Sequence, residues 1–267
     1  MRYELAHGRI QTWALEAHLV DHCNLRCAGC CPLSPHAPES FADPDGLARD
    51  LQLAATALAP RLLRLTGGEP TLHPKIVECL QAARASKVAP RIQVTTNGTK
   101  VAELPDAFFT NVDVLKLSLY PSAPLTQKAV ERLEARCGEH GVELQARAFD
   151  RFQRVTPREL TQSPEQTQRA FHECWMKTRC HLVHRGHFYM CTRPPKLEPY
   201  LRRHGIANTL ADDDGVALDG PRLAERILRM LEREEPMESC RHCLGNSGEW
   251  SQHRQLSREE IAAGRDD

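Results

Sequence analysis

The chain has 267 residues, and its 35 lysine and arginine residues are balanced by 35 aspartate and glutamate residues. This balance argues against nucleic acid as the main partner, because proteins that grip nucleic acid usually carry a basic excess. No apolar run approaches the roughly 20 residues that span a bilayer, and the N-terminus lacks the apolar core of a signal peptide, so we expect a cytoplasmic protein without a membrane segment. In that setting the 11 cysteines indicate metal or redox use rather than disulfides.

The first predicted strand, residues 12–20, leads into a cysteine-rich loop with the spacing C-x3-C-x2-C. The cysteines of this loop are Cys23, Cys27 and Cys30. Three thiolates so close in sequence can hold three corners of a four-iron cube. They leave one iron open to bind a reactant, as catalytic metal sites do. The alternative is a structural zinc site whose fourth ligand is Cys31, His22 or His36.

A glycine-rich motif follows the second predicted strand. A helix at 44–58, capped by Asp43, precedes this strand at 61–66, which runs into Gly67-Gly68-Glu69-Pro70. Paired glycines let a ligand approach the backbone, and the glutamate is an acceptor for an ammonium group.

Strands and helices continue to alternate up to about residue 150. The remaining elements are a helix at 75–86, a strand at 91–96 ending in the polar turn Asn97-Gly98, a helical turn at 101–109, a strand at 112–120, a helix at 125–139 and a strand at 142–149. This repetition predicts a parallel sheet or barrel. Polar residues alternate with apolar ones in the strands, so we expect one face of the sheet to enclose a polar interior. The residues expected to face it are Glu16, His18, Arg64, Thr66, Gln93, Thr95, Lys116, Ser118, Gln145 and Arg147. An antiparallel sheet with one wet face is the alternative.

A second, smaller domain is predicted after residue 160. It contains a helix with a capping box at Ser163–Gln166, a hairpin at 181–191 that turns at Arg185-Gly186, and a helix opened by Pro221. The predicted organisation is 1–160 for the barrel, 161–251 for the second domain and 252–267 for a loose tail.

With the cysteine loop, the Gly-Gly-Glu-Pro motif and the polar turn in this order, the chain resembles the radical S-adenosylmethionine (SAM) superfamily. The resemblance implies an α/β fold with a partial (β/α)6 barrel. It also implies a [4Fe-4S] cluster on Cys23, Cys27 and Cys30 whose open iron binds S-adenosylmethionine. The family cleaves this cofactor to a 5′-deoxyadenosyl radical, which abstracts hydrogen from the substrate. One departure is Gly29, because many members carry an aromatic residue just before the third cysteine.

The resemblance also implies roles for other residues. Gly67, Gly68, Glu69 and Pro70 would meet the SAM ammonium, Ser118 the ribose, and Asn97 the adenosine or its surroundings. The match at Ser118 is weaker because Ser-Leu-Tyr-Pro replaces the commoner Ser-x-Asp-Gly. Arg147 would pair with the SAM carboxylate or the substrate, or is an ordinary surface arginine. The other substrate-side candidates are Lys116, Tyr120, Glu16 and His18.

The later cysteines resemble a twitch domain, a shortened SPASM domain built from a β-hairpin and a helix that holds one auxiliary [4Fe-4S] cluster. The matching positions are Cys174, Cys191, Cys240 and Cys243, and Cys180 is a fifth candidate that competes with Cys174. A zinc ribbon built from the same cysteines is the alternative. Cys79 and Cys137 fall on apolar helical faces and are expected in the core, and Cys31 is expected to be unliganded.

Four cysteines would close the coordination of the auxiliary cluster, which suits an electron acceptor. Radical SAM dehydrogenases of aminocyclitols, such as 2-deoxy-scyllo-inosamine dehydrogenase, look similar in size and domain order. We therefore expect oxidation or rearrangement of a small sugar-like or aminocyclitol-like molecule, with an external electron donor such as flavodoxin or ferredoxin. The alternatives are an enzyme that modifies a short peptide, and a non-catalytic iron–sulfur or zinc protein.

Overall fold

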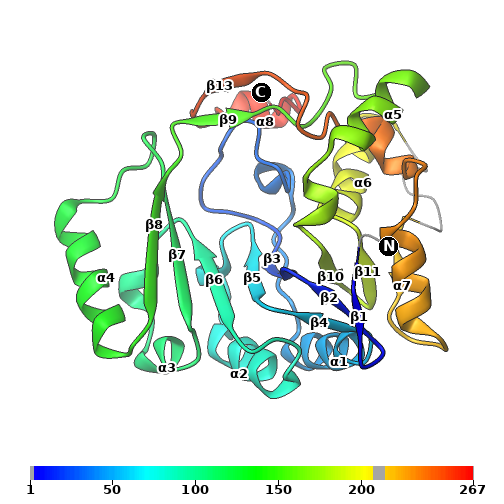
Figure 1. Ribbon diagram of the computed structural model, residues 1–267. Coiled ribbons are helices and arrows are strands. Elements are labelled where there is room, and N and C mark those ends of the chain that lie inside the picture. The colour runs from blue at the N-terminus through cyan, green and yellow to red at the C-terminus, as the bar shows by residue number, and fades with distance from the viewer. Residues whose placement is uncertain (1–2, 207–213, 267) are drawn as a thin grey trace.

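The computed structural model describes residues 3–206 and 214–266. Its centre is an eight-stranded sheet in the order β12-β11-β10-β3-β5-β6-β7-β8 (Figure 1). The strands are β3 (Leu15–Val20), β5 (Leu63–Gly67), β6 (Ile92–Thr96), β7 (Val114–Leu119), β8 (Glu143–Ala148), β10 (Leu182–His184), β11 (His187–Tyr189) and β12 (Val216–Ala217). The neighbours from β10 to β8 are all parallel, so the sheet is a partial barrel and the antiparallel alternative was wrong.

Helices cover the outer face of this sheet because each one presents an apolar stripe to it. They are α1 (Pro44–Ala55), α2 (Ile76–Ser86), α3 (Asp106–Phe109) and α4 (Gln127–Glu139), which follow the outside of the curved sheet (Figure 1). Asp43 caps α1 by accepting from the Gly46 N–H at 2.9 Å, as predicted. The helix ends at Ala55 rather than residue 58, because Leu58 begins the strand β4 (Leu58–Pro60).

A small second sheet lies at the opposite end from the cysteine loop. It joins β1 (Leu5–Ala6), β2 (Arg9–Thr12) and β4 in that order. The strand predicted over residues 12–20 is therefore two strands, β2 and β3, because the chain breaks at Trp13-Ala14 to pass from one sheet to the other. The two sheets share one apolar core, in which Ile10, Leu15 and Leu58 are fully buried.

The predicted hairpin forms, but it belongs to the barrel sheet. β10 pairs in parallel with β3, with Leu182 opposite Glu16, and antiparallel with β11. Arg185 and Gly186 both have positive φ (47° and 79°), as a two-residue hairpin turn requires. The predicted boundary after residue 160 thus separates segments that share one sheet.

Helices make up most of the remaining regular structure between residues 164 and 242. They are α5 (Pro164–Glu173), η4 (Met176–Thr178), α6 (Pro194–Arg203), α7 (Leu223–Leu231) and η5 (Glu238–His242). The capping box of α5 at Ser163 and Gln166 is present. Pro221 does not open α7, because the backbone of Arg222 is left-handed (φ 53°) and the helix starts at Leu223. No element was predicted over α6, because its two leading prolines and internal Pro199 are unfavourable for a helix interior.

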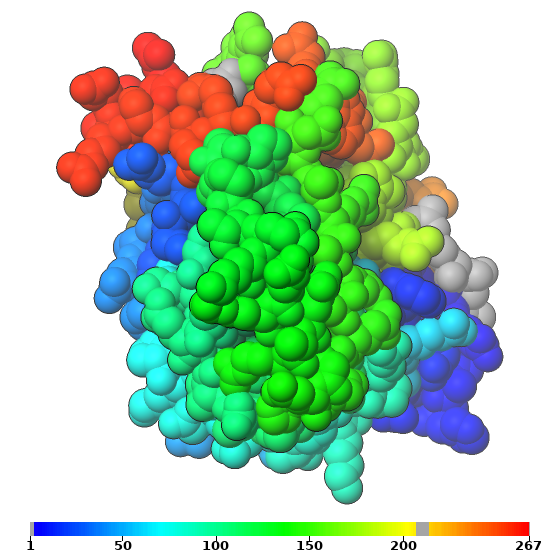
Figure 2. Space-filling model, turned by 90° about the vertical axis from the view of Figure 1, so that its left-hand side faces the viewer, coloured from blue at the N-terminus to red at the C-terminus, as the bar shows by residue number. Residues whose placement is uncertain are grey.

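The C-terminal segment differs from the loose tail that was expected at 252–267. β13 (Trp250–Gln252) pairs with β9 (Arg151–Gln153), α8 (Arg258–Ala262) follows, and Leu256 is 1% exposed. In the space-filling view this red segment lies across the top of the molecule, beside blue atoms of the N-terminal part (Figure 2). Asp267 lies outside the described residues. Across the part of the chain that is described, no helix combines the length and the apolar character needed to cross a membrane.

Candidate active site

The first cysteine loop lies at the carboxyl end of β3, beside the ends of β5 and β6. A cavity of about 230 Å³ there is lined by Cys23, Cys27 and Cys30 together with Gly67, Gly68, Glu69, Asn97, Ser118, Tyr120 and Phe152. Residues from the loop, the Gly-Gly-Glu-Pro motif and the polar turn therefore share one cavity. Pro70 is buried at the start of η2 (Pro70–Leu72), beside this group.

Desolvation favours the protonated form of the three thiols. Burial and, to a smaller extent, the neighbouring Glu69 and Cys27 together raise the pKa of Cys23 to about 12. Burial also raises the pKa of Cys27 and Cys30. A cationic metal centre reverses this preference, so loading it would release protons. Within residues 3–206 and 214–266, no three His, Cys or acidic side chains are placed to hold one metal ion. The irons of a cube occupy separate corners, so its ligands need not meet at one point.

The two glycines bring backbone strands together. A Cβ on Gly67 would lie 2.0 Å from the Val20 carbonyl oxygen, and one on Gly68 would lie 1.8 Å from the His22 carbonyl oxygen. Gly68 donates to the Val20 carbonyl at 2.7 Å, and Glu69 to the His22 carbonyl at 3.1 Å. The motif is therefore glycine-rich because it packs on the start of the cysteine loop, a constraint that the sequence analysis had assigned to a ligand.

Glu69 is a buried carboxylate with several donors. Its Oε1 accepts from the Thr71 N–H at 3.0 Å, the Thr71 hydroxyl at 2.5 Å and the Thr96 hydroxyl at 2.7 Å. Its Oε2 accepts from the Asn97 N–H at 2.7 Å. Burial raises its pKa, while these bonds lower it. Oε2 keeps capacity for another donor, such as an ammonium group.

Asn97 and Tyr120 flank the cysteines. The Asn97 amide donates to Asn24 Oδ1 at 2.8 Å, and its Nδ2 lies 3.8 Å from Cys23 Sγ. Burial, and then the three cysteines, raise the pKa of Tyr120, while a hydrogen bond with Ser118 opposes the rise. Tyr120, a substrate-side candidate from the sequence, lines the cysteine cavity.

A second, central cavity of about 400 Å³ adjoins the first. Its barrel wall is polar and carries Glu16, His18, Arg64, Thr66, Gln93, Thr95 and Lys116. Its other wall is aromatic and carries Phe149, Phe152, Trp175 and Trp250. The strand alternation predicted the first wall. The second comes from segments far apart in sequence, and no local motif marks it.

Glu16 is the acidic group of this cavity. Arg64 Nη1 lies 3.3 Å from its Oε1, and Lys116 is nearby. Burial raises the pKa of Glu16 despite these cations. Burial and the adjacent Arg64 lower the pKa of Lys116. Arg147 does not share the cavity, because β8 is exposed there and its guanidinium lies over Phe149 at 5.0 Å. Gln145 is exposed on the same strand.

The later cysteines form a second group. Cys174, Cys191, Cys240 and Cys243 line one small cavity together with Lys177 and Arg193. Burial raises the pKa of Cys191, and Cys240, Cys243 and Cys174 raise it further. Cys180 instead faces the central cavity, where it lies beside Glu16. Cys31 lines both the first and the central cavity, with its Sγ 3.8 Å from Met176 Sδ.

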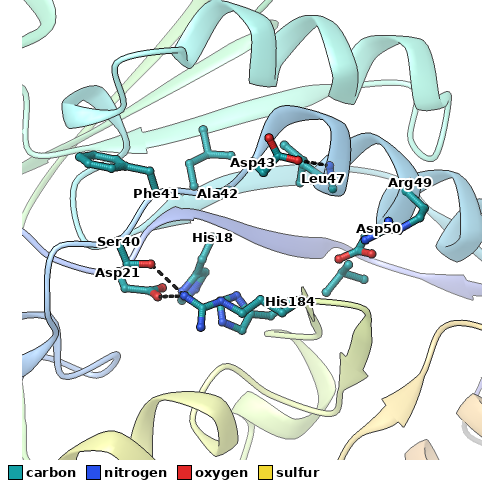
Figure 3. A pocket seen from close by; sticks show the side chains of 14 residues that line it. His18, Asp21, Ser40, Phe41, Ala42, Asp43, Leu47, Arg49, Asp50 and His184 are labelled. Carbon is teal, nitrogen blue, oxygen red and sulfur yellow. Dashed lines mark hydrogen bonds and ion pairs between the residues drawn. The ribbon is translucent and has the colours of Figure 1, made fainter.

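A third cavity of about 420 Å³ opens beside the hairpin turn. Figure 3 shows Asp21 and Ser40 on one side, Asp50 on the other, and His18 and His184 between them. Arg185 donates to Ser40 Oγ at 2.9 Å, and Asp50 accepts from the Gly186 N–H at 2.7 Å. His18 also lines the central cavity, so its side chain lies between the third cavity and the central cavity.

Comparison with known families identifies the superfamily of the chain. The Radical SAM superfamily model matches residues 18–161. The chain belongs to this superfamily. Enzymes of the superfamily use a [4Fe-4S] cluster and S-adenosylmethionine, and the protein is a radical SAM enzyme. The free thiols of the first loop fit such a cluster, and the donor-rich cavity beside them fits the cofactor.

Curated relatives match only part of this chain. The GTP 3',8-cyclase of Streptomyces coelicolor is 32% identical over 130 residues, 47% of this chain and 38% of its own length. The GTP 3',8-cyclase of Mycobacterium marinum is 40% identical over 92 residues, 33% of this chain and 26% of its own length. The chain thus spans well under half of each relative.

Solved structures resemble the chain at low identity. BtrN in complex with AdoMet and 2-DOIA covers 83% of this chain and 82% of its own, with a TM-score of 0.47 and 13% identity. Streptococcus suis SuiB bound to S-adenosylmethionine covers 54% of this chain and 42% of its own, with a TM-score of 0.36 and 16% identity.

Proposed function

We propose that this radical SAM enzyme oxidises a small polar ring molecule, of the sugar or aminocyclitol class, in the central cavity. The observation that carries the proposal is the grouping of Cys174, Cys191, Cys240 and Cys243 around one cavity. Four cysteines give every iron of an auxiliary [4Fe-4S] cluster a terminal ligand. Such a closed centre takes up an electron and does not bind substrate.

The two walls of the central cavity suit a ring with one polar edge and one apolar face. Glu16, Arg64 and Lys116 offer hydrogen bonds to hydroxyl or amino groups. Trp175 and Trp250, about half exposed, offer flat surfaces at the rim. A few polar groups in a largely apolar pocket are typical of small-molecule sites.

The oxidation removes one hydrogen atom, one proton and one electron from a carbon–oxygen or carbon–nitrogen unit. The bound cluster and S-adenosylmethionine supply the radical that takes the hydrogen atom. The Glu16 carboxylate is placed to accept the proton, since its raised pKa moves it toward the range of an effective general base. Cys191 is buried and Cys174 and Cys240 are partly buried, which limits the access of water to the electron-accepting centre.

A purine nucleotide is the second candidate substrate. The curated relatives are named GTP 3',8-cyclase, and the central cavity holds three cations, Arg64, Lys116 and Arg151. Cations attract phosphates, although Glu16 offsets part of this charge.

The test measures 5′-deoxyadenosine formed by the anaerobically reconstituted enzyme with aminocyclitols, sugars, GTP and a short peptide. We expect stimulation by an aminocyclitol or sugar. Stimulation by GTP alone would favour the nucleotide, and stimulation by the peptide alone would overturn the proposal in favour of a peptide-modifying enzyme.

A separate substitution tests the role of the auxiliary centre. Cys191→Ala is expected to abolish the oxidised product while 5′-deoxyadenosine still forms. The matched control is Cys137→Ala, which removes a core thiol that is 1% exposed in α4. Full product formation by Cys191→Ala would rule out the auxiliary centre as the acceptor.

A further inference from the structure

The C-terminal strap, residues 253–266, crosses the catalytic cysteine loop. Three backbone bonds join them. Ala28 donates to the Arg254 carbonyl at 3.0 Å, Gly29 to the Asp266 carbonyl at 2.5 Å, and Leu256 to the Arg26 carbonyl at 2.6 Å. An isolated antiparallel bridge between Cys27 of the loop and Gln255 of the strap adds to these contacts. The strap is therefore hydrogen-bonded to the backbone of the loop that bears the three thiols.

The side chain of Gln255 uses three of its hydrogen-bonding positions at this contact. Its Oε1 accepts from the Arg26 N–H at 2.5 Å. Its Nε2 donates to Ser122 Oγ at 2.8 Å and to Cys27 Sγ at 3.6 Å. The bond from Arg26 fixes which end of the amide is oxygen, because a backbone N–H needs an acceptor. The nitrogen must then face the thiol.

Ser122 holds the amide from the other side. Its hydroxyl also lies 3.0 Å from His253 Nδ1, and the His253 ring stacks on Tyr120 with centroids 4.7 Å apart. Tyr120 itself lines the cysteine cavity. The Gln255 amide is thus held by a network rather than by one contact.

A donor to a thiolate sulfur has a specific consequence in an iron–sulfur site. Hydrogen bonds to the sulfurs are among the factors that set the reduction potential of a cluster. The donor spreads the negative charge of the sulfur and so stabilises the reduced state, which carries one more negative charge. Partners of metal ligands also fix the ligands' orientation.

We propose that Gln255 is a positioning residue for the catalytic cluster, donating from Nε2 to Cys27 Sγ and anchoring the loop through Oε1. Through this contact the C-terminal strap raises the reduction potential of the centre that cleaves S-adenosylmethionine. The inference rests on the cluster common to the superfamily and not on the proposed substrate.

Two substitutions separate the donor from the anchor. Gln255→Glu keeps an oxygen for the Arg26 N–H but removes the donor to Cys27. Gln255→Leu removes both without adding charge. The matched control is Gln252→Leu, because Gln252 is an exposed residue just before the strap, at the end of β13, where its backbone pairs with Arg151 of β9.

The test is an EPR-monitored redox titration of the reconstituted enzymes, alongside iron content per chain. Both Gln255 variants are expected to keep their iron, to show a lower potential for the catalytic cluster and to form 5′-deoxyadenosine more slowly with a weak reductant. Gln252→Leu is expected to match the wild type.

An unchanged reduction potential in both iron-loaded Gln255 variants would overturn the inference. A lower potential in Gln255→Glu alone would also overturn it, because the added negative charge would then explain the change. A wild-type chain that takes up no iron would overturn both this inference and the proposed function. Normal potentials in the variants would leave the proposed function standing.

Discussion

Asn97 donates its backbone N–H to Oε2 of Glu69 at 2.7 Å. This bond ties the Gly-Gly-Glu-Pro motif after β5 to the polar turn after β6. The same carboxylate takes two donors from Thr71 and one from Thr96. Glu69 therefore shapes the wall of the cysteine cavity and also offers its remaining lone pair to that cavity.

Glu69→Gln is predicted to weaken both folding and cofactor binding. Its amide keeps one oxygen for the Thr71 and Thr96 donors but turns an N–H toward the N–H of Asn97. An unsatisfied buried donor costs about 1–3 kcal/mol, and the charge that would attract an ammonium is lost. Urea unfolding and equilibrium binding of S-adenosylmethionine measure the two effects. Glu78→Gln, on the exposed face of α2, is the control, and equal behaviour of the two variants would contradict the role of Glu69.

Phe152→Leu is predicted to weaken S-adenosylmethionine binding about tenfold, since base–aromatic stacking contributes about 1–3 kcal/mol. Phe152 lines the cysteine cavity, and a Cβ on Gly29 would meet its Cβ at 3.8 Å. Its ring thus stands beside the position where many superfamily members carry an aromatic residue. Binding is measured at equal iron content. Phe149→Leu, which changes only the central cavity, should bind normally, and a loss there as large as that in Phe152→Leu would argue against stacking by Phe152.

Cys174→Ala is predicted to lose about half of the iron, because two four-iron clusters hold about eight irons together. Cys180→Ala is predicted to keep it all. Cys174 lines the cavity of the second cysteine group, whereas Cys180 lies beside Glu16 in the central cavity. Iron analysis and Mössbauer spectra of the two variants decide between them, and the reverse pattern would make Cys180 the ligand.

His181 is predicted to make folding sensitive to acid. Burial lowers its pKa from 6.5 to about 4, and its Nδ1 donates to the Met190 carbonyl at 2.8 Å. Between these two pKa values the unfolded chain binds a proton at His181 and the folded chain does not. The free energy of unfolding is therefore highest above about pH 6.5 and falls as the pH decreases toward 4. The full difference corresponds to about 3 kcal/mol.

The measurement for His181 is thermal unfolding under anaerobic conditions from about pH 7.5 to about pH 5. His181→Gln should be less stable than the wild type at the upper end and should lose less stability on acidification. Parallel curves for the two proteins would show that His181 does not titrate between the folded and unfolded states.

Local sequence signals predicted the elements that contain their own capping or turn residues. Asp43, the capping box at Ser163 and the turn at Arg185-Gly186 each fix one element through contacts with near neighbours. By contrast, the prolines of α6 hid a helix because they occupy its first turn and one tolerated interior position. The strand β10 was found, but its pairing with β3 was not, since parallel partners are set by long-range packing.

The same contrast holds for the site. The cysteines and Glu69 were found because their spacing is a motif, and the barrel-facing polar residues because strands alternate. Arg147 does not face the polar interior that the strand alternation predicted, because β8 is an exposed edge; its exposure agrees with the alternative of an ordinary surface arginine. Nothing local marks Phe152, Trp250 or Gln255, since each reaches its cavity from a segment remote from the motif beside it.

The most direct test of radical SAM chemistry at the first loop is the formation of 5′-deoxyadenosine from S-adenosylmethionine with a strong reductant, without oxygen. We predict formation by the reconstituted wild type and by Cys137→Ala, whose thiol lies in the core, and none by Cys27→Ala. Equal formation by Cys27→Ala, or a protein that takes up zinc and no iron, would contradict this prediction.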